Sequence, residues 1–399
     1  MKLLLHDYPG HAFTLALSRR LAKRGWDVEH VYSSSFAGPK GEFSRTGSEP
    51  EALAVVDLSD GETVEKYRYV RRLLQERSYA RRLQRRIVQT CPDVVLSGNA
   101  PTDMHVSALR ASAAVGAACV FWVQDLYGLA IKAYTRGVLG WVASSHFSRI
   151  ERLVASRADG VVLITEAFAP HLRLDPNDPR VDEVPNWAPI DEIPSLPKET
   201  EWARSQDLAH SQAVVYSGTL GKKHDPAQLR DLAVGVPADS VKVVVVSEGL
   251  GADWLCENAS HVTNLKVVPF TAHEIVPQVL ASADVLVGLL EPQASALSVP
   301  SKVLAYLCAG RPIVLSAPSD NQASQMVRSA EAGTVVAPGD SEALLAAVSH
   351  YLAHPAVAAA AGRAGRAFAE RTFDIDGIAA RFDGVLRRAI ERRALRGSK

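Results

Sequence analysis

The sequence predicts an α/β protein made of two doubly wound, parallel-sheet domains. Short β-rich runs alternate with helical patterns from the first residues onward, stop at a proline-rich segment, and then start again. One run of the second half, residues 242–246, is a lysine followed by four valines. Continuous apolar runs of this kind are typical of parallel strands that are buried on both faces. The length of 399 residues also favours two domains over one.

The first half begins with a strand at 3–5, an amphipathic helix that ends near Gly25, and a second strand at 28–32. A helix of this length between two such strands implies a right-handed βαβ unit with parallel pairing. The pattern then repeats. Further strands are expected at 94–96, 119–123 and 160–164, and further helices at 64–89, 103–115, 140–157 and 166–173.

The proline-rich segment VPNWAPIDEIPSLP interrupts this alternation and indicates a connection between domains. We expect an N-terminal domain at 1–185, a linker at 186–200, a C-terminal domain at 201–372 and a C-terminal helix at 373–399 that can cross back to the first domain. In the second half, strands are expected at 214–216, 241–246, 266–268, 285–289, 313–315 and 334–336, and helices at 225–234, 251–258, 273–280, 300–309, 321–330 and 341–352.

The composition excludes several classes of protein. Basic and acidic residues number 44 each, so no net charge attracts nucleic acid. The N-terminus MKLLLHDYPG is too short in apolar residues for a signal sequence, and the most apolar longer stretch is interrupted by Arg110. We therefore expect a cytoplasmic protein. The four cysteines, Cys91, Cys119, Cys256 and Cys308, form no CxxC pair, and we expect them to be reduced, mostly buried and without metal.

The segment SGTLGKKHDP, residues 217–226, follows a strand and precedes a helix. Its glycines allow backbone N–H groups to approach an anion, and its lysines add positive charge beside them, which suits a diphosphate. The spacing of a Walker A loop is absent. A plain glycine-rich turn with solvated lysines explains the same residues, so the segment alone leaves both interpretations open.

The segment VPSKVLAYLCAGRPIV, residues 299–314, opens a helix with proline, Ser301 and Lys302 and closes it with Gly310. Such a helix start exposes free backbone N–H groups that bind phosphate or sugar hydroxyls. A third segment, AGTVVAPGD at 332–340, reads only as a strand that ends in a turn.

Together these three segments resemble the retaining glycosyltransferases of family 4, which have the GT-B fold of two domains facing a cleft. The closest likeness is to members that make exopolysaccharide and colanic acid. The segments FWVQDLY (121–127), ADGVVLIT (158–165) and VPNW (184–187) extend the resemblance into the first half. The resemblance implies transfer of a sugar, with retention, from a UDP- or GDP-sugar to a saccharide or lipid-linked acceptor. It implies no cofactor and no required metal.

The resemblance also implies roles for particular residues. Lys223 matches the basic residue that contacts the donor diphosphate. The other donor-binding residues would be Gly218, Thr219, Glu248, Phe270, Ser301 and Lys302. Many family members carry two glutamates eight residues apart near the donor sugar, but here these places hold Leu297 and Ala305. Glu291, six residues before Leu297, is a candidate replacement.

In the first half, Asp125 follows the strand at 119–123 where many members have a histidine. It is a candidate general base or orienting group, although an aspartate that caps the turn is the alternative. Tyr8 and Gly10 lie in the loop after the first strand, which the resemblance places near the acceptor. His11 would orient the acceptor there, unless it is an ordinary surface histidine.

The helix at 64–89 is rich in arginine. On a helical wheel Arg68, Arg71, Arg72, Arg82 and Arg86 form one stripe with Gln75 and Tyr79, opposite an apolar side of Tyr69, Val70, Leu73, Ala80, Leu83 and Ile87. The C-terminal tail adds Arg387, Arg388, Arg392, Arg393 and Arg396. Related enzymes act on lipid-linked acceptors, so we expect peripheral binding to the anionic inner face of the plasma membrane. A solvated helix face is the alternative, and no nucleic-acid motif accompanies the arginines.

Two further functions remain open from the sequence. A sugar-nucleotide 2-epimerase would have a similar fold but needs a cluster of His and Glu that the sequence lacks. A catalytically idle nucleotide-sugar-binding or scaffold subunit of a polysaccharide assembly would explain the missing glutamate pair.

Overall fold

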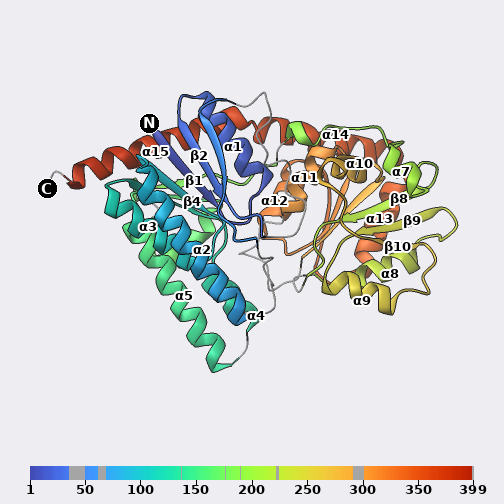
Figure 1. The fold of residues 1–399 in the computed structure, drawn as a ribbon. Helices are drawn as coiled ribbons and strands as arrows, with labels where there is room; N and C mark the ends of the chain where they lie inside the picture. Colours follow the sequence, from blue (N-terminus) through green and yellow to red (C-terminus); the bar gives the residue numbers. More distant parts are fainter. Residues whose placement is uncertain are drawn as a thin grey trace. The chain divides into compact units, whose positions relative to one another are not determined.

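The computed structural model describes residues 1–35, 50–61, 69–135, 137–175, 177–188, 190–221, 224–290 and 301–397. For residues 69, 70, 133, 134 and 301 it describes the backbone alone. The chain divides into two compact units. The N-terminal unit comprises Met1–Asn186 and Ile375–Lys399, and the C-terminal unit comprises Trp187–Asp374. Each unit is built on one parallel sheet covered by helices (Figure 1).

The sheet of the N-terminal unit has seven strands in the order β3-β2-β1-β4-β5-β6-β7. Its strands are β1 Lys2–Asp7, β2 Asp27–Tyr32, β3 Leu53–Asp57, β4 Val94–Gly98, β5 Ala118–Val123, β6 Gly160–Leu163 and β7 Val181–Glu183. Strand β1 pairs with β2 on one side and β4 on the other, so Leu3 lies opposite both Val28 and Val94. The strand order reverses between β1 and β4. Loops leave a parallel sheet in opposite directions at such a point, which is where doubly wound folds bind ligands.

Helices cover both faces of this sheet. They are α1 Ala12–Lys23, α2 Tyr69–Thr90, α3 Thr102–Val115, α4 Tyr127–Tyr134, α5 Val138–Arg157, α6 Ala169–Leu172 and α15 Ile375–Gly397, with the 3-10 turn η1 Glu166–Phe168. Helices α1 and α15 pack together, α2 packs on α3, and α3 packs on α5. The C-terminal helix α15 is docked firmly, because the Phe382 ring lies 4.9 Å from the Trp122 ring and Asp383 accepts a hydrogen bond from Trp26 at 2.7 Å.

The sheet of the C-terminal unit has six strands in the order β10-β9-β8-β11-β12-β13. They are β8 Gln212–Ser217, β9 Val241–Val246, β10 Leu265–Val268, β11 Val285–Leu289, β12 Ile313–Ser316 and β13 Gly333–Val336. All of the pairs are parallel. The strand order reverses between β8 and β11, so the loop after β8 occupies the same topological position as the loop after β1.

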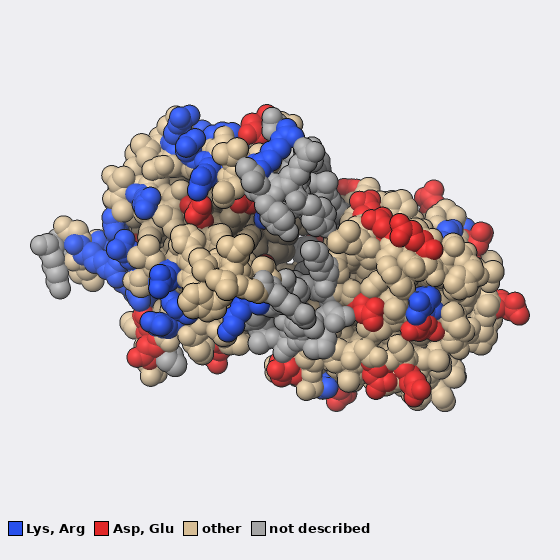
Figure 2. All heavy atoms as spheres, turned by 90° about the horizontal axis from the view of Figure 1, so that it is seen from below, with Lys and Arg blue, Asp and Glu red and all other residues tan. Residues whose placement is uncertain are grey.

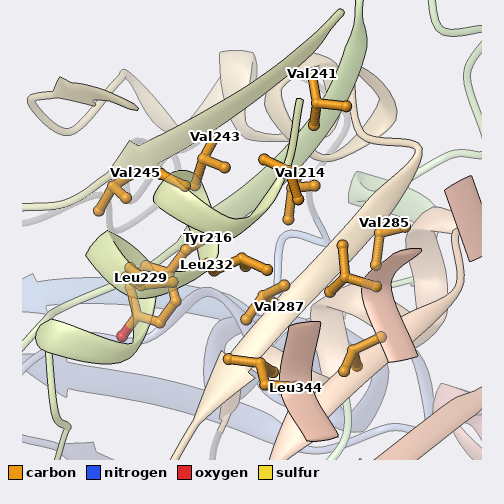
Figure 3. Close-up of a cluster of buried hydrophobic side chains, with 14 of the residues drawn as sticks. Val214, Tyr216, Leu229, Leu232, Val241, Val243, Val245, Val285, Val287 and Leu344 are labelled. Carbon is orange, nitrogen blue, oxygen red and sulfur yellow. The ribbon is translucent and has the colours of Figure 1, made fainter. Parts of the chain in front are cut away.

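The helices of this unit are α7 Glu201–Ser205, α8 Ala227–Gly235, α9 Leu250–Asn258, α10 Val276–Ala281, α11 Ser301–Ala309, α12 Gln322–Ser329, α13 Ser341–Ala353 and α14 Pro355–Thr372, with the 3-10 turns η2 Ile190–Glu192 and η3 His273–Ile275. One side of the sheet forms a core with α8, α9 and α13. Figure 3 shows Val214, Val243 and Val287 of the sheet facing Leu229 and Leu344 of the helices.

The predicted fold class is confirmed: both units are α/β with doubly wound parallel sheets. The sequence patterns did not reveal β3, β7, α4, α7 and α14 as separate elements. Strands β3 and β7 lie at the two edges of their sheet, and their residues are mostly half-buried. Strand β7 has three residues, two of them acidic, so it lacks the continuous apolar run that identified the central strands. Strand β3 does contain such a run, residues 53–56, which the sequence-based prediction missed.

The predicted faces of α2 need correction. Tyr79, which the wheel placed among the arginines, is 1% exposed and packs on Tyr8 at a ring distance of 4.5 Å. Leu73, which was expected to pack on the sheet, is 39% exposed. The helix is buried along a face that includes Tyr79, Leu83 and Ile87. The long aliphatic stems of arginine can lie along apolar surface while the charged group reaches solvent. The positions of the arginines therefore did not identify the solvent-exposed face of α2.

Two expectations from composition can be compared with the structure. Cys119 and Cys308 are buried, but Cys91 and Cys256 are exposed, so the expectation of mostly buried thiols is wrong for two of the four. Among the described residues no single helix has the length and apolar character to cross a bilayer. Only the bent pair Ser341–Ala353 and Pro355–Gly397, which turns by 103°, meets those criteria, by length and composition alone.

Candidate functional site

The loop after β8 is attached to α11 by the Tyr306 side chain. The Tyr306 hydroxyl accepts a hydrogen bond from the Ser217 N–H at 2.9 Å and donates one to the Ser217 carbonyl at 3.0 Å. Tyr306 is 1% exposed, and burial raises the pKa of its hydroxyl, so the group stays neutral and able to donate. Because an unmade hydrogen bond is costly in a buried site, this pair fixes where the loop begins.

Lys302, in the first turn of α11, lies against the same loop. Its ammonium group is 4.1 Å from the centroid of the Tyr216 ring and donates a hydrogen bond to the Tyr216 hydroxyl. That hydroxyl donates in turn to the Thr219 carbonyl at 3.0 Å. Burial lowers the pKa of Lys302 to about 7, although part of the side chain still meets solvent. An anion bound beside it would replace the lost hydration and restore its charge.

Position 218 requires a glycine for two reasons. Its φ of 135° is a backbone conformation that other residues rarely adopt. A Cβ at this position would also lie 3.2 Å from the Lys302 Cε atom. The chain thus passes directly over the lysine stem, and the neighbouring Thr219 is exposed. The predicted donor residues Gly218, Thr219 and Lys302 are brought together by the structure.

Glu248 and Phe270 follow the adjacent strands β9 and β10. The Glu248 carboxylate accepts a hydrogen bond from the Phe270 N–H at 3.3 Å. Helix α9 then begins at Leu250 and approaches the β8 loop, since the Gly251 N–H donates to the Leu220 carbonyl at 2.8 Å. The loops after three neighbouring strands therefore form one continuous edge.

Several predicted donor residues cannot be placed. Lys223, Glu291 and Leu297 lie outside the described residues, and of Ser301 only the backbone at the start of α11 is described. Ala305 lies on α11 and is half-buried, so this helix position carries no carboxylate.

In the N-terminal unit, the loop after β1 is organised by Asp7. This carboxylate is 1% exposed and accepts hydrogen bonds from the His11 N–H at 2.6 Å, from the His11 imidazole at 3.0 Å and from the Thr14 hydroxyl at 2.5 Å. Burial opposes ionisation of Asp7, but His11 and Thr14 outweigh it and hold the carboxyl pKa below its usual value. Gly10 closes the turn with a φ of 70° and donates to the Asp7 carbonyl at 3.1 Å. His11 is therefore a fixed, half-exposed imidazole at this edge.

Tyr8 points away from solvent and belongs to a polar cluster at the start of α2. It is 3% exposed and packs on Tyr79. Arg72 and Glu76 of α2 form an ion pair of 2.7 Å, and both interact electrostatically with Tyr8 and with Tyr127 at the start of α4. Burial raises the pKa of Glu76 and outweighs the neighbouring arginine. The sequence assigned Arg72 to a solvent stripe, whereas the structure places it beside the β1 loop.

Asp125 is exposed at the end of β5, where the sequence placed it. The preceding Gln124 is buried and accepts a hydrogen bond from the Asn186 amide at 2.8 Å. Behind them, Glu151 of α5 is 4% exposed, accepts from the Gly128 N–H at 3.3 Å, and has its pKa raised to about 7 by burial. Among the described residues, no three His, Cys, Asp or Glu side chains group as metal ligands.

Sequence reasoning missed the residues that position these loops. Tyr216, Tyr306, Asp7 and Thr14 all act through side-chain bonds to a loop rather than through a motif. Asp7 had a detectable signal, because a carboxylate that ends an apolar strand four residues before His11 can accept hydrogen bonds from the turn that leads into the following helix. Tyr306 had none, since its partner Ser217 lies 89 residues away.

Comparison with known families matches both halves of the chain. Residues 10–187 match the family described as "Glycosyl transferase 4-like domain", and residues 212–354 match "Glycosyl transferases group 1". The comparison with curated proteins gives no match.

Solved structures show the same fold over nearly the whole chain. Sucrose-phosphate synthase from Thermosynechococcus elongatus matches with a TM-score of 0.74 at 16% identity, over 97% of this chain and 98% of that one. Anabaena HepE in complex with UDP-glucose matches with a TM-score of 0.70 at 16% identity, over 97% and 99%. An α,α-trehalose-phosphate synthase (UDP-forming) from Burkholderia vietnamiensis matches with a TM-score of 0.69 at 11% identity, over 98% and 99%. With the two family matches in tandem and the sheet topology of each unit, the chain belongs to the family 4-like glycosyltransferases, enzymes of the GT-B fold.

Proposed function

We propose that this glycosyltransferase transfers a sugar, with retention, from a UDP- or GDP-sugar to a saccharide or lipid-linked acceptor in the synthesis of cell-surface polysaccharide. The proposed donor site rests on one observation: the Lys302 side chain lies beneath the Gly218 backbone in the loop after β8. A half-buried cation and a glycine turn meet there at the reversal point of a doubly wound sheet. UDP-sugars are the first donors to test, because HepE, solved in complex with UDP-glucose, and the UDP-forming trehalose-phosphate synthase share the fold.

The proposed donor site uses the edge formed by the loops after β8, β9 and β10. Lys302, Lys223 and the backbone at Ser301 would contact the diphosphate, with Gly218 and Thr219 beside them. Glu248 and Phe270 would contact the nucleoside. Glu291 would read the donor sugar in place of the absent glutamate pair. No cofactor and no metal take part in this proposal.

The proposed mechanism follows from the negative charge that develops on the leaving diphosphate. The bond between the anomeric carbon and the diphosphate oxygen breaks, and the acceptor oxygen forms its bond on the same face of the sugar. The acceptor proton passes to the departing diphosphate oxygen, so no separate protein base is required. The cations at Lys302 and Lys223 stabilise the negative charge that the diphosphate gains. In the N-terminal unit, Asp125 and His11 would orient the acceptor, with Tyr8 and Gly10 shaping the loop beside it.

We place the enzyme in the cytoplasm at the inner face of the plasma membrane. The surface suggested by the sequence is the arginine stripe of α2, namely Arg71, Arg72, Arg82 and Arg86, with Arg68 outside the described residues.

The test is incubation with a panel of nucleotide sugars and measurement of the UDP or GDP released, first alone and then with lipid-diphosphate-sugar acceptors. Lys302→Ala is expected to raise the donor KM at least about tenfold, which corresponds to about 1.4 kcal/mol of lost binding. The matched control is Lys266→Ala, which changes an exposed lysine of β10. Equal behaviour of the two variants would exclude the donor-site assignment.

The second candidate is an idle nucleotide-sugar-binding or scaffold subunit. It is favoured by one observation, the alanine at position 305 where a glutamate is expected. Saturable nucleotide binding without release of UDP or GDP from any donor and acceptor would establish this alternative.

A further inference from the structure

Large apolar side chains are exposed in a cluster at the start of α5. Val138 is 78% exposed, Leu139 85%, Trp141 67% and Val142 51%. The other exposed large hydrophobic residues of the described chain are single or, at Leu73 and Leu74, paired. Scattered apolar residues are ordinary on a protein surface, whereas four within five positions mark a contact site. We call Val138, Leu139, Trp141 and Val142 the α5 tip.

The helical hairpin of α4 and α5 holds this tip away from the core. A Cβ at Gly140 would lie 2.7 Å from the Thr135 carbonyl oxygen, so the first turn of α5 packs directly on the end of the connecting loop. Further along, the Ser144 hydroxyl donates to the Gly128 carbonyl at 2.7 Å. Because glycine and serine fill the inner side of the hairpin, the bulky residues of this turn face outward. Figure 1 shows the start of α5 projecting beyond α2 and α3 in the N-terminal unit.

The charged residues of the chain segment around the α5 tip have one sign. Residues 126–150 contain Lys132, Arg136 and Arg149 and no aspartate or glutamate. Lys132 and Arg149 are exposed. In Figure 2, which looks onto the lower side of Figure 1, uncharged surface on the N-terminal unit is bordered by several Lys and Arg groups and by fewer Asp and Glu groups. An apolar tip whose own chain segment supplies cations and no anions complements a bilayer that carries anionic headgroups.

The arginine stripe of α2 is less suited to this contact. Arg72 pairs with Glu76 at 2.7 Å, Arg82 with Asp60 at 3.1 Å and Arg86 with Glu29 at 2.7 Å. Guanidinium groups neutralised by carboxylates of the same chain add little net attraction for an anionic surface. The stripe also lacks an exposed apolar group comparable with Trp141.

We propose that the α5 tip inserts into the headgroup region of an anionic bilayer, with Trp141 and Leu139 entering the apolar boundary and Lys132 and Arg149 contacting lipid phosphates. Tryptophan favours this interface because its ring is apolar and its N–H is polar. The inference rests on the proposed action at a membrane and specifies the surface that makes the contact. A lipid surface fits a small, convex, projecting group better than a protein partner does, since a protein partner requires a larger complementary area.

Vesicle binding tests the proposal directly. We expect the full-length protein to sediment with vesicles of phosphatidylcholine and phosphatidylglycerol at low salt, and much less with phosphatidylcholine alone. The double variant Leu139→Ser with Trp141→Ser should lower the vesicle partition coefficient at least about tenfold. The matched control, Val234→Ser with Val357→Ser, removes two exposed valines of the C-terminal unit, 65% and 45% exposed, and should bind as the wild type does.

Tryptophan fluorescence provides a second readout. Trp26, Trp122, Trp187 and Trp202 are buried and Trp254 is half-buried, so Trp141 is the tryptophan most open to lipid. Emission should shift to the blue on anionic vesicles, and brominated lipid should quench it. Lys132→Ser should weaken binding to anionic vesicles only and leave the small binding to neutral vesicles unchanged.

Three outcomes would overturn the proposal: undiminished vesicle binding by the double variant, no quenching by brominated lipid, or a wild-type dimer that the double variant converts to monomer. The last would identify a second copy of the chain as the occupant. Nucleotide release measured without vesicles, on a water-soluble acceptor, separates this question from the proposed function. The double variant should keep this nucleotide-release activity. If the wild type shows no such activity, the enzymatic proposal is refuted and the membrane proposal is not.

Discussion

The ammonium group of Lys302 lies 4.1 Å from the centre of the Tyr216 ring and donates a hydrogen bond to its hydroxyl. Loss of hydration is the cause that lowers the Lys302 pKa to about 7. A ring face and a neutral hydroxyl stabilise the cation only partly. The lysine is therefore prepared to gain its full charge from an incoming anion.

Donor affinity should consequently depend on pH. Free Lys302 loses its proton as the pH rises through about 7, whereas a bound diphosphate raises its pKa and keeps it charged. Above about pH 7 donor binding must take up a proton, so affinity should fall by up to about tenfold per pH unit. Below pH 7 it should be flat. Calorimetry in buffers of different ionisation enthalpy measures the proton uptake.

The control for this prediction is Lys302→Arg, whose guanidinium stays charged throughout and should remove the pH dependence. Wild-type affinity that is constant between about pH 7 and about pH 9 would contradict the role given to Lys302.

Tyr306→Phe should weaken donor binding without removing any group that touches the donor. The variant loses both hydrogen bonds to Ser217 and leaves half-buried backbone groups without these partners, which costs about 1–3 kcal/mol of stability. We expect a higher donor KM because the loop loses its fixed position. Tyr351→Phe is the matched control, since the Tyr351 hydroxyl meets Thr334 at 3.2 Å on β13. The assignment fails if both variants show the same KM.

Gly251→Ala should separate α9 from the β8 loop. The new Cβ would lie 2.6 Å from the Leu220 Cγ and 2.7 Å from its carbonyl oxygen, so one of the two segments must move. We expect a loss of about 1–3 kcal/mol in unfolding free energy, measured by urea titration. Among the described residues, the new Cβ of Gly221→Ala in the same loop would meet Thr219 alone, at 3.8 Å, so this variant should be tolerated. A Gly251→Ala protein as stable as Gly221→Ala would show that this contact is not tight.

Acid should destabilise the N-terminal unit before it protonates most carboxylates. Burial lowers the pKa of His6 from 6.5 to about 3 and those of His30 and His105 to about 4. Between about pH 6.5 and about pH 4 the unfolded chain binds protons that the folded unit excludes. Stability is thus complete above about pH 6.5 and falls as the pH drops, by about 1.4 kcal/mol per histidine and pH unit. The Asp7 carboxyl, whose pKa is lowered from 3.8, adds stability that is lost only as the pH falls below this range.

The variant His105→Asn isolates one of these protons. An asparagine can keep the hydrogen bond that the His105 Nδ1 makes with Ser97 at 2.9 Å, but it does not titrate. Urea unfolding at a series of pH values should give a shallower slope for the variant. An unchanged slope would show that His105 does not contribute to acid sensitivity.

The central elements of both sheets could be predicted because each carries its own signal. The valines of β9 are continuous, and the glycine turn after β8 lies between a strand and a helix. Strand β7 lacked this signal because it has only three residues and two of them are acidic. The burial of Tyr79 was mispredicted because arginine stems and an aromatic ring can share one side of a helix while only the ring enters the core.

The sequence by itself determined the fold class, the two-sheet arrangement and the loops that carry Gly218, His11 and Asp125, since these follow from local periodicity and from glycine and proline positions. Only the tertiary structure decided which side chains meet. Lys302 reaches Tyr216 across 86 residues, and Tyr306 reaches Ser217 across 89. Such pairs depend on strand order and on the rotation of α11 about its axis. Both are set by packing of the whole unit, and no local pattern records them.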